Sequence, residues 1–207
     1  MELYEAIEKR HTIRDFIANK PVPEETLKRI LAAGLKAPSH DHERNWHFIV
    51  IRDAVRIADT LAAVGKKAEW QMGIVRSWQD APAEKKDMYL DAVPKQTRML
   101  MQSGCLVIPL FKAPEGMMQP KGMTDLNPFA SIWAVIQNIL LAATAEGVGV
   151  ALRIPIYDEE DHVLKSVNAP EGYKFPCYLA FGYAAPDAPV IRQTPCPIEE
   201  RIHLGSW

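Results

Sequence analysis

The sequence predicts one layered domain of β-strands and α-helices, of the α/β or α+β class. Its 207 residues are enough for one good core and too few for two typical domains. Hydrophobic residues make up 48% of the chain and charged residues 24%, which is an ordinary globular mixture. Short apolar runs that indicate strands alternate with stretches of helical spacing, and this alternation favours packed layers. The pattern leaves the strand order open.

Local signals place the first elements. Leu3 and Ile7 share one face of a short helix. Pro23, followed by two acidic residues, is typical of a helix start, and Asp53 is a good helix N-cap. The expected elements are helices over 2–10, 23–34 and 54–64 and a strand over 47–52.

The second half of the chain is more varied. Residues 66–103 are polar and are expected to be mostly helical, with breaks near Pro82 and Pro94. A strand is expected over 105–111, although Pro109 weakens that expectation. Residues 112–128 are expected to form a loop. Beyond them we expect helices over 128–147 and 158–167, strands over 148–154 and 177–183, and an extended proline-rich arm from residue 184.

One apolar stretch invites comparison with a membrane span. Residues 129–145 carry no charge, and this length is near the lower limit for a spanning helix. Gln137 and Asn138 lie at its centre. Pro128 and Gly147 are start and stop signals typical of helices in soluble proteins. We therefore expect a buried core or interface helix and no membrane span.

Charge and cysteine content argue against several classes of protein. The formal net charge is −2 and no long basic run is present, so a nucleic-acid or anionic-membrane partner is not expected. Cys105, Cys177 and Cys196 are far apart and lack metal-ligand spacing, which is typical of reduced thiols. The N-terminus lacks the basic start and apolar run of a signal peptide. We expect a cytoplasmic protein.

The segment Arg10-His11-Thr12-Ile13-Arg14 is a candidate anion site. It carries two fixed positive charges four residues apart, with an imidazole and a hydroxyl between them. A guanidinium fork beside a hydroxyl suits a phosphate, and a second arginine suits another electron-rich group. The alternative, which the chemistry alone favours, is a solvated helix end where arginine interacts with the helix dipole.

Several segments together resemble the FMN-dependent nitroreductase family. In the family's order they are residues 10–16, 37–39, 46–50, 134–143, 147–150 and 178–183. The resemblance implies an α+β fold with a mixed, largely antiparallel sheet flanked by helices. It also implies an intertwined homodimer of single FMN-binding domains, residues 1–207, in which residues 184–207 form an extended C-terminal arm around the partner.

The resemblance implies roles for the N-terminal motif. Arg10 matches the position that holds the FMN phosphate, and His11 matches a ribityl or ring-side contact. Thr12 keeps a hydroxyl donor where the family usually has serine. Arg14 matches a basic position at the pyrimidine edge of the flavin, where a cation stabilises the negative charge that builds on reduction. A surface salt bridge to a nearby acidic residue is the alternative for Arg14.

Other matching positions lie further along the chain. Pro38 and Ser39 match a turn of the partner subunit that touches the dimethylbenzene side and the phosphate region. Ile154, Pro155 and Ile156 match a segment that runs past the flavin edge near N5, where main-chain amides would make the contacts.

The chain departs from the family's pattern at two places. His42 stands where the family commonly has asparagine, Arg44 where it has glutamine, and Asn45 where it has proline. His42 can still donate a hydrogen bond. Near the C-terminus the family has a pair of basic residues against the phosphate, and here only Arg192 is well placed.

The segment His40-Asp41-His42 is a candidate metal site. His40 and His42 flank Asp41, and such a set can share a metal ion in a strand or loop. Two exposed loop imidazoles are the favoured interpretation, so no metal is expected.

Two further features keep two interpretations each. The methionine-rich loop over 112–127 is a candidate for acceptor contact, because methionine adapts to varied flat molecules, or it is a surface loop. Gly147 and Gly149 either allow a close helix–strand approach or form an ordinary helix C-cap.

The resemblance implies an enzyme in which the flavin carries the chemistry and no catalytic side chain is required. NADH or NADPH would reduce FMN at N5, and a small electron-poor acceptor, nitroaromatic or quinone-like, would then be reduced at the same face by a ping-pong mechanism. The alternatives are a related flavoenzyme with reductive dehalogenase or flavin-fragmenting chemistry, and a non-enzymatic flavin-binding protein.

Overall fold

The computed structural model describes residues 1–156 and 158–207. Its α-helices are α1 (Leu3–Lys9), α2 (Glu24–Gly34), α3 (Ala54–Thr60), α4 (Ala68–Ser77), α5 (Ala83–Lys95), α6 (Arg98–Met101), α7 (Asn127–Ala145) and α8 (Glu159–Ser166). Its strands are β1 (Trp46–Ile51), β2 (Cys105–Lys112), β3 (Gly149–Arg153), β4 (Tyr173–Lys174) and β5 (Tyr178–Gly182). Short 3-10 turns lie at η1 (His40–His42), η2 (Met123–Leu126) and η3 (Ile198–Glu200).

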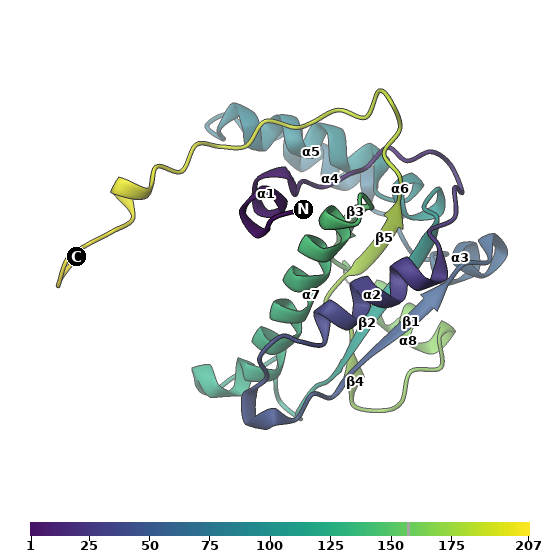
Figure 1. Ribbon diagram of the computed structural model, residues 1–207. Coiled ribbons are helices and arrows are strands. Elements are labelled where there is room, and N and C mark those ends of the chain that lie inside the picture. The colour runs from purple at the N-terminus through teal and green to yellow at the C-terminus, as the bar shows by residue number, and fades with distance from the viewer. Residues whose placement is uncertain (157) are drawn as a thin grey trace.

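The strands form a sheet in the order β1-β2-β5-β3, and β4 pairs with the end of β2 (Figure 1). Each of these pairings is antiparallel. A parallel bridge between Thr12 and Val150 adds a parallel contact at the β3 edge. The expected α+β class, with a mixed and largely antiparallel sheet flanked by helices, is therefore confirmed.

The sheet separates two hydrophobic layers. On one face, α2 and α7 pack through residues such as Ile30 and Ile136 against Val107 of β2. On the other face, residues such as Leu100 and Val163, from α6 and α8, pack against Leu106 of β2 and its neighbours. Because successive side chains of a strand point to opposite faces, β2 is buried on both sides, and this explains its unbroken apolar run.

Pro109 is accommodated inside β2 by a gap in the pairing. On this strand the Lys112 N–H donates toward Asn45, beside β1, and the Ala113 N–H donates toward Gly172, on the opposite side. By alternation the nitrogen of Pro109 faces away from β1. On that side the β5 pairing ends at Val107 and the β4 pairing begins at Phe111, so no ladder hydrogen bond is lost.

The uncharged stretch forms α7, the core helix. Ile132, Val135, Ile136, Ile139 and Ala143 are buried against α2 and the sheet. Met123–Ala145 is long and apolar enough to cross a membrane by length and composition alone, a test that core helices also pass. One face of α7 is thus buried in the core, and 33% of its apolar window is buried in one chain, so both the core and the interface alternatives remain compatible with it.

Most element boundaries agree with the expectations within a few residues. Pro82 is the N-cap of α5, and Pro94 lies in its last turn, so both predicted breaks are present. The third helix is shorter than expected, because α3 ends at Thr60 and turns follow. Strand β4 was not expected, because a two-residue strand has no periodicity in the sequence.

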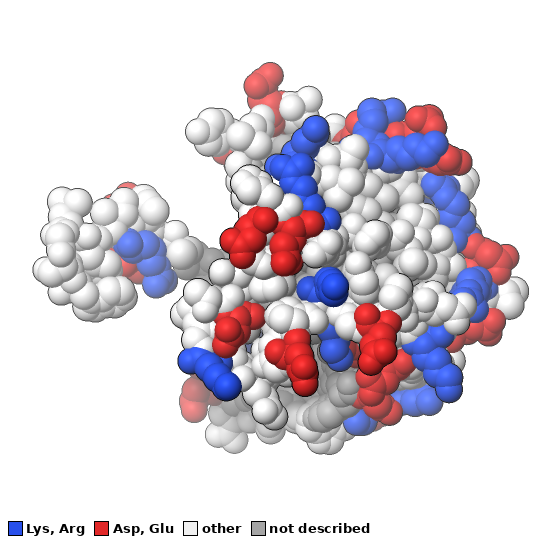
Figure 2. Space-filling view, turned by 90° about the horizontal axis from the view of Figure 1, so that it is seen from below, with Lys and Arg blue, Asp and Glu red and all other residues white. Residues whose placement is uncertain are grey.

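The C-terminal segment leaves the body of the molecule. Beyond Ala188 it runs past α5 and α1 and projects away from the other elements (Figure 1). Val190, Ile198 and Leu204 along it are exposed. On the face seen in Figure 2, basic and acidic side chains are interspersed, without a wide area of one sign.

Candidate functional site

The Arg10–Arg14 segment lies along the free edge of β3. The Ile13 N–H donates to the Val150 carbonyl at 3.1 Å, and Ile13 is buried. This close approach requires glycine at position 149, because a Cβ there would lie 2.7 Å from Ile13 Cγ1. Gly147 has φ +72°, so it forms the left-handed C-cap of α7. The two glycines therefore divide between the two roles considered for them.

Arg10 lines a cavity of about 220 Å³ between the N-terminal segment and the end of α7. Lys9, His11 and Gly149 also line it. Within the described residues, the Arg10 guanidinium makes no hydrogen bond or ion pair. His11 is oriented locally, because its Nδ1 lies 2.8 Å from the Lys9 carbonyl oxygen. The cavity therefore offers an uncommitted guanidinium, which suits a phosphate.

Arg14 lies in a different cavity, of about 300 Å³, between β3 and α5. Its Nη1 lies 3.6 Å from Asp91 Oδ2, and only 12% of the Arg14 side chain is exposed. Burial lowers the pKa of Arg14, while the negative charges of Asp91 and Asp15 act in the opposite direction. The alternative of a salt bridge is thus partly realised, but through Asp91 of α5 rather than a close Asp15 or Glu5 contact.

A buried ionic network supports the floor of this second cavity. Arg153 Nη2 donates to Glu159 Oε1 at 2.8 Å, and its Nε donates to Gln96 Oε1 at 3.0 Å. Glu159 also accepts from the main-chain N–H groups of Gly65 and Ile156. Each residue of the ion pair is less than a tenth exposed. The network joins β3, α5, α8 and the turn after α3.

The network reduces the number of main-chain N–H groups in residues 154–156 that are free to bind a ligand. The Ile156 N–H donates to Glu159 at 2.9 Å, and Pro155 has no N–H. Ile154 is therefore the one residue of the three whose N–H is not committed to a described acceptor. Of the main-chain amides expected to contact the flavin, only that of Ile154 is therefore free of a described acceptor. Ile154 lines the Arg14 cavity and is 57% exposed.

Pro38, Ser39 and His42 lie at the other end of α7. The His40 N–H donates to Ser131 Oγ near the start of α7, whereas Thr144 near its end lines the Arg10 cavity. Between Ser131 and Thr144 the helix rises roughly 20 Å. One chain therefore does not bring Pro38, Ser39 and His42 together with Arg10.

The loop that follows Ser39 is strained and incompletely bonded. Asp41, His42 and Arg44 all have positive φ, between 46° and 54°. The Ser39 hydroxyl is buried and has no hydrogen-bond partner among the described residues. Strain and an unpaired buried polar atom are both more frequent at functional sites than elsewhere.

Arg192 is placed on the arm, away from the Arg10 cavity. Its Nη2 lies 3.5 Å from Glu84 Oε1 at the start of α5, and its side chain is 78% exposed. It lines neither the Arg10 cavity nor the Arg14 cavity. Within one chain Arg192 is thus not a neighbour of Arg10.

The first part of the methionine-rich loop borders a third cavity, of about 780 Å³. Met117 and Met118 line it together with Tyr173 and the end of α8. Leu164 and Tyr173 belong to the core layer opposite α7. None of the residues that line this third cavity lines the Arg14 cavity.

Among the described residues, no group of three or more histidine, cysteine or acidic side chains is arranged to hold a metal ion. His40 Nε2 lies 3.6 Å from Glu43 Oε2. Cys105 and Cys177 are buried, and burial raises the pKa of both thiols, that of Cys105 to about 11.

Comparison with known proteins decides the family. The model of the nitroreductase family matches residues 7–183, which include the Arg10–Arg14 segment, α7 and every strand of the sheet. The chain belongs to the nitroreductase family. The resemblance seen in the sequence is therefore confirmed.

Its relatives in the family carry different activities in their names. Iodotyrosine deiodinase of Nematostella vectensis is 26% identical over 216 residues, covering 98% of this chain and 75% of the relative. 4-Nitrobenzoate reductase of a Nocardioides species is 21% identical and covers 92% and 84%. Mammalian iodotyrosine deiodinases match over 52 residues, which is 18% of their length.

A solved structure supports the fold of this family member. The crystal structure of oxidised iodotyrosine deiodinase, bound to FMN and 3-iodo-L-tyrosine, has a TM-score of 0.73 and 18% identity. The alignment covers 100% of both chains. At this identity the likeness shows the fold.

Sequence reasoning missed the partners of the arginines. Asp91, Gln96 and Glu159 were not expected near the site, because each lies on a polar helix with no local sign of its partner. One signal was available for the buried pair: Arg153 is the single charge in an apolar strand run, and a buried charge requires a partner.

Proposed function

We propose that this chain is an FMN-dependent oxidoreductase. It would pass reducing equivalents from NADH or NADPH to an electron-poor small molecule, by a ping-pong mechanism. The observation that carries the proposal is Arg10, an uncommitted guanidinium that lines a cavity beside the glycine-permitted edge of β3. The FMN named in the structural relative and the family membership support the same assignment.

The residues present suit the cofactor. Arg10 would bind the phosphate, with His11 in the same cavity. Thr12 lines neither this cavity nor the Arg14 cavity, so its hydroxyl contact with the cofactor rests on the family resemblance alone. Bound FMN would supply the electron transfer between nicotinamide and acceptor. Arg14 would stabilise negative charge at the pyrimidine edge, and the Ile154 N–H would donate toward the flavin edge near N5. These groups act by position and charge, so no acid–base pair is needed.

We further propose that the working unit is a homodimer of single domains, residues 1–207. Arg10 and Ser39 lie at opposite ends of α7, so two copies packed with antiparallel α7 helices would bring one copy's Arg10 beside the other's Ser39. Leu3, Tyr4 and Ile7 of α1 are exposed, and the arm projects from the body. Both features supply apolar surface for a second copy.

The unpaired Ser39 hydroxyl and the exposed His42 would then contact the partner's cofactor, with Pro38 fixing the turn. Arg192, carried by the arm, would reach the phosphate only across this interface. Free cysteines and the net charge of −2 are consistent with action in the cytoplasm.

The acceptor would be a flat, electron-poor molecule such as a nitroaromatic or a quinone. Met88, Tyr89 and Met99 give the Arg14 cavity an apolar wall, while Gln71 and Gln96 give it hydrogen-bonding groups. A flat aromatic ring with polar substituents fits such a lining.

Reductive dehalogenation is the second candidate. It is favoured by one observation, the alignment with iodotyrosine deiodinase over 98% of this chain. The same cofactor cradle serves both proposals, so they differ only in the acceptor.

The test uses the purified protein under nitrogen. The proposal expects stoichiometric FMN after gel filtration, bleaching by NADH or NADPH, and reoxidation by a nitroaromatic or quinone. Bleached protein that instead releases iodide from 3-iodotyrosine supports dehalogenation. Protein that retains no FMN when supplied with it contradicts both. Light scattering tests the dimer, and a stable flavin-loaded monomer would rule it out.

A further inference from the structure

Helix α5 carries a cluster of charges against Arg14. Asp91 and Lys95, one turn apart, face Arg14 and Asp15 of the N-terminal segment. The Lys95 ammonium donates hydrogen bonds to both Asp15 and Asp91. Arg98 Nη2, from α6, lies 2.7 Å from Asp15 Oδ1. Four of these side chains are each no more than 21% exposed: the cations Arg14 and Lys95 and the carboxylates Asp15 and Asp91.

Asp91 is the member of this cluster that faces Arg14 directly. Its Oδ1 accepts from Lys95, whereas its Oδ2 lies 3.6 Å from Arg14 Nη1. That Oδ2 atom is buried and accepts no hydrogen bond from a described residue. The contact is therefore an ion pair without a directed hydrogen bond, and it holds the guanidinium at the wall of the 300 Å³ cavity.

The charges of the cluster decide how Arg14 acts on a bound flavin. Reduction adds negative charge to the isoalloxazine, which a nearby cation favours and a nearby carboxylate opposes. Because the cluster is largely shielded from water, these charges interact more strongly than they would on the surface. With Asp91 present, the charges of Arg14 and Lys95 are balanced by the carboxylates of Asp15 and Asp91. Without it, Arg14 and Lys95 face Asp15 alone.

We propose that Asp91 is a positioning residue that holds Arg14 in the cofactor cavity and offsets its charge, thereby setting the reduction potential of the bound flavin. The inference rests on the proposed function, because it requires FMN beside Arg14. The proposal gives helix α5, which lies outside the N-terminal motif, an influence on the reduction potential of the flavin. Asp91 acts through Arg14 and does not itself touch the cofactor.

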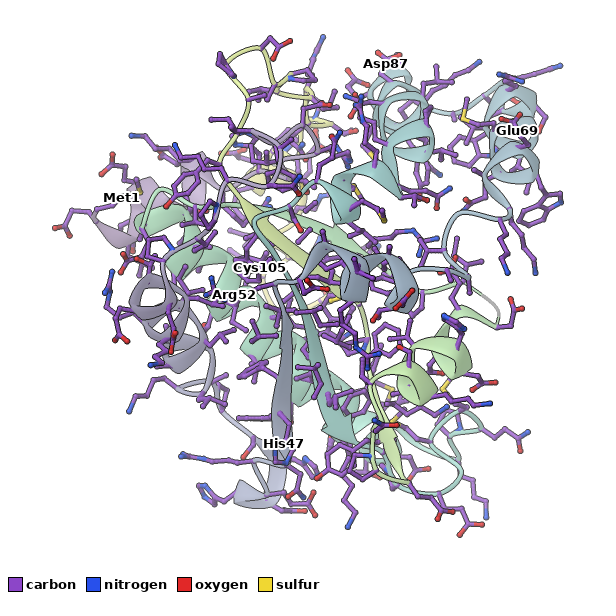
Figure 3. The ribbon with its side chains drawn as sticks, turned by 90° about the vertical axis from the view of Figure 1, so that its right-hand side faces the viewer. Met1, His47, Arg52, Glu69, Asp87 and Cys105 are labelled. Carbon is purple, nitrogen blue, oxygen red and sulfur yellow. The ribbon has the colours of Figure 1, made fainter. Side chains whose placement is uncertain are left out.

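The test compares Asp91→Asn with wild type, both loaded with FMN, by spectroelectrochemical titration. We expect Asp91→Asn to favour reduced over oxidised flavin about tenfold more than wild type, a rise of about 30 mV for a two-electron couple. Asp87→Asn is the matched control, because Asp87 lies one turn earlier on α5, is exposed, and points away from the body (Figure 3). This control is expected to leave the potential near the wild-type value.

Two further variants test the same proposal independently. Lys95→Met is expected to lower the potential, since it removes a cation and leaves Asp15 and Asp91 beside Arg14; this opposite shift tests the proposal if Asp91→Asn folds poorly. In an Arg14→Gln background the Asp91→Asn shift is expected to shrink, because Asp91 acts through Arg14.

The outcomes distinguish failure of the proposed function from failure of the role of Asp91. Wild-type protein that binds no FMN overturns the proposed function and this inference together. Wild-type protein that binds FMN, with an Asp91→Asn potential unchanged, lowered or shifted no more than by Asp87→Asn, overturns only the role of Asp91. A loss of stability without a rise in potential likewise assigns Asp91 a purely structural role.

Discussion

The surroundings of Arg10 and Arg153 differ in how completely each guanidinium is bonded. Arg153 is buried and donates to Glu159 and Gln96, and its carboxylate partner also binds two main-chain N–H groups. Arg10 lines an open cavity and makes no bond to a described side chain. A fully bonded buried arginine stabilises one fold, whereas an uncommitted arginine at a cavity is available to a ligand.

Arg14 lies between these extremes. It has one ion-pair partner, at 3.6 Å, and it lines a cavity. The comparison therefore predicts that changes near Arg153 alter stability, changes at Arg10 alter cofactor affinity, and changes at Arg14 alter the cofactor's properties.

The largest effect is expected at the buried pair. Glu159→Gln leaves the Arg153 charge without a carboxylate, and breaking a buried ion pair in this way costs about 3–5 kcal/mol of unfolding free energy. Urea titration measures it. Glu160→Gln is the matched control, because Glu160 pairs with the part-exposed Lys174 at 3.1 Å and should cost less than about 1 kcal/mol. Equal losses of unfolding free energy in the two variants would mean that the buried Arg153–Glu159 pair stabilises the fold no more than the part-exposed Lys174–Glu160 pair does.

The second effect concerns Arg10 and should appear in binding. A charged hydrogen bond to phosphate contributes roughly 1.5–3 kcal/mol, so Arg10→Ala should weaken FMN binding about 10- to 150-fold. Fluorescence titration of the apoprotein with FMN measures the dissociation constant. Arg29→Ala, which removes an exposed guanidinium paired with Glu146, should leave the constant unchanged. An Arg10→Ala protein that retains FMN as wild type does would reject the phosphate role.

The third effect concerns Arg14 and should appear in the potential. Arg14→Gln keeps a hydrogen-bonding group but removes the charge, so the two-electron potential should become more negative and reduction by nicotinamide slower. FMN should still bind at saturating concentration. Because Asp91 offsets part of the Arg14 charge, this shift is expected to be smaller than that of an unpaired cation. An unchanged potential would mean that Arg14 points away from the flavin.

The smallest effect is expected on the surface. Arg29 Nε donates to Glu146 Oε1 at 2.9 Å, and this hydrogen bond holds the pKa of Glu146 below its ordinary value of 4.5. A carboxyl whose folded pKa is lowered contributes stability above its unfolded pKa and loses it as the pH falls through the folded pKa. Arg29→Ala should therefore lower the urea midpoint slightly at neutral pH, and the difference should vanish in acid. A larger loss than that of Glu159→Gln would contradict the comparison.

Local sequence signals determined most of the elements. Apolar spacing, the Asp53 N-cap and the prolines at 23 and 82 placed the helices, because these signals act within one or two turns of chain. Their reliability fell where an element is very short, as with β4, or where turn residues extend a helix, as after Thr60. The arginine motif and its resemblance likewise came from consecutive residues.

The tertiary structure alone decided what each of these residues contacts. Asp91 meets Arg14, and Gln96 meets Arg153, across 77 and 57 residues of sequence, and neither pairing leaves a local pattern. The same is true of the packing that places Ser39 and Arg10 at opposite ends of α7. A sequence specifies which groups are available through short-range chemistry, but long-range packing decides which of them are consumed by the fold and which remain for a ligand.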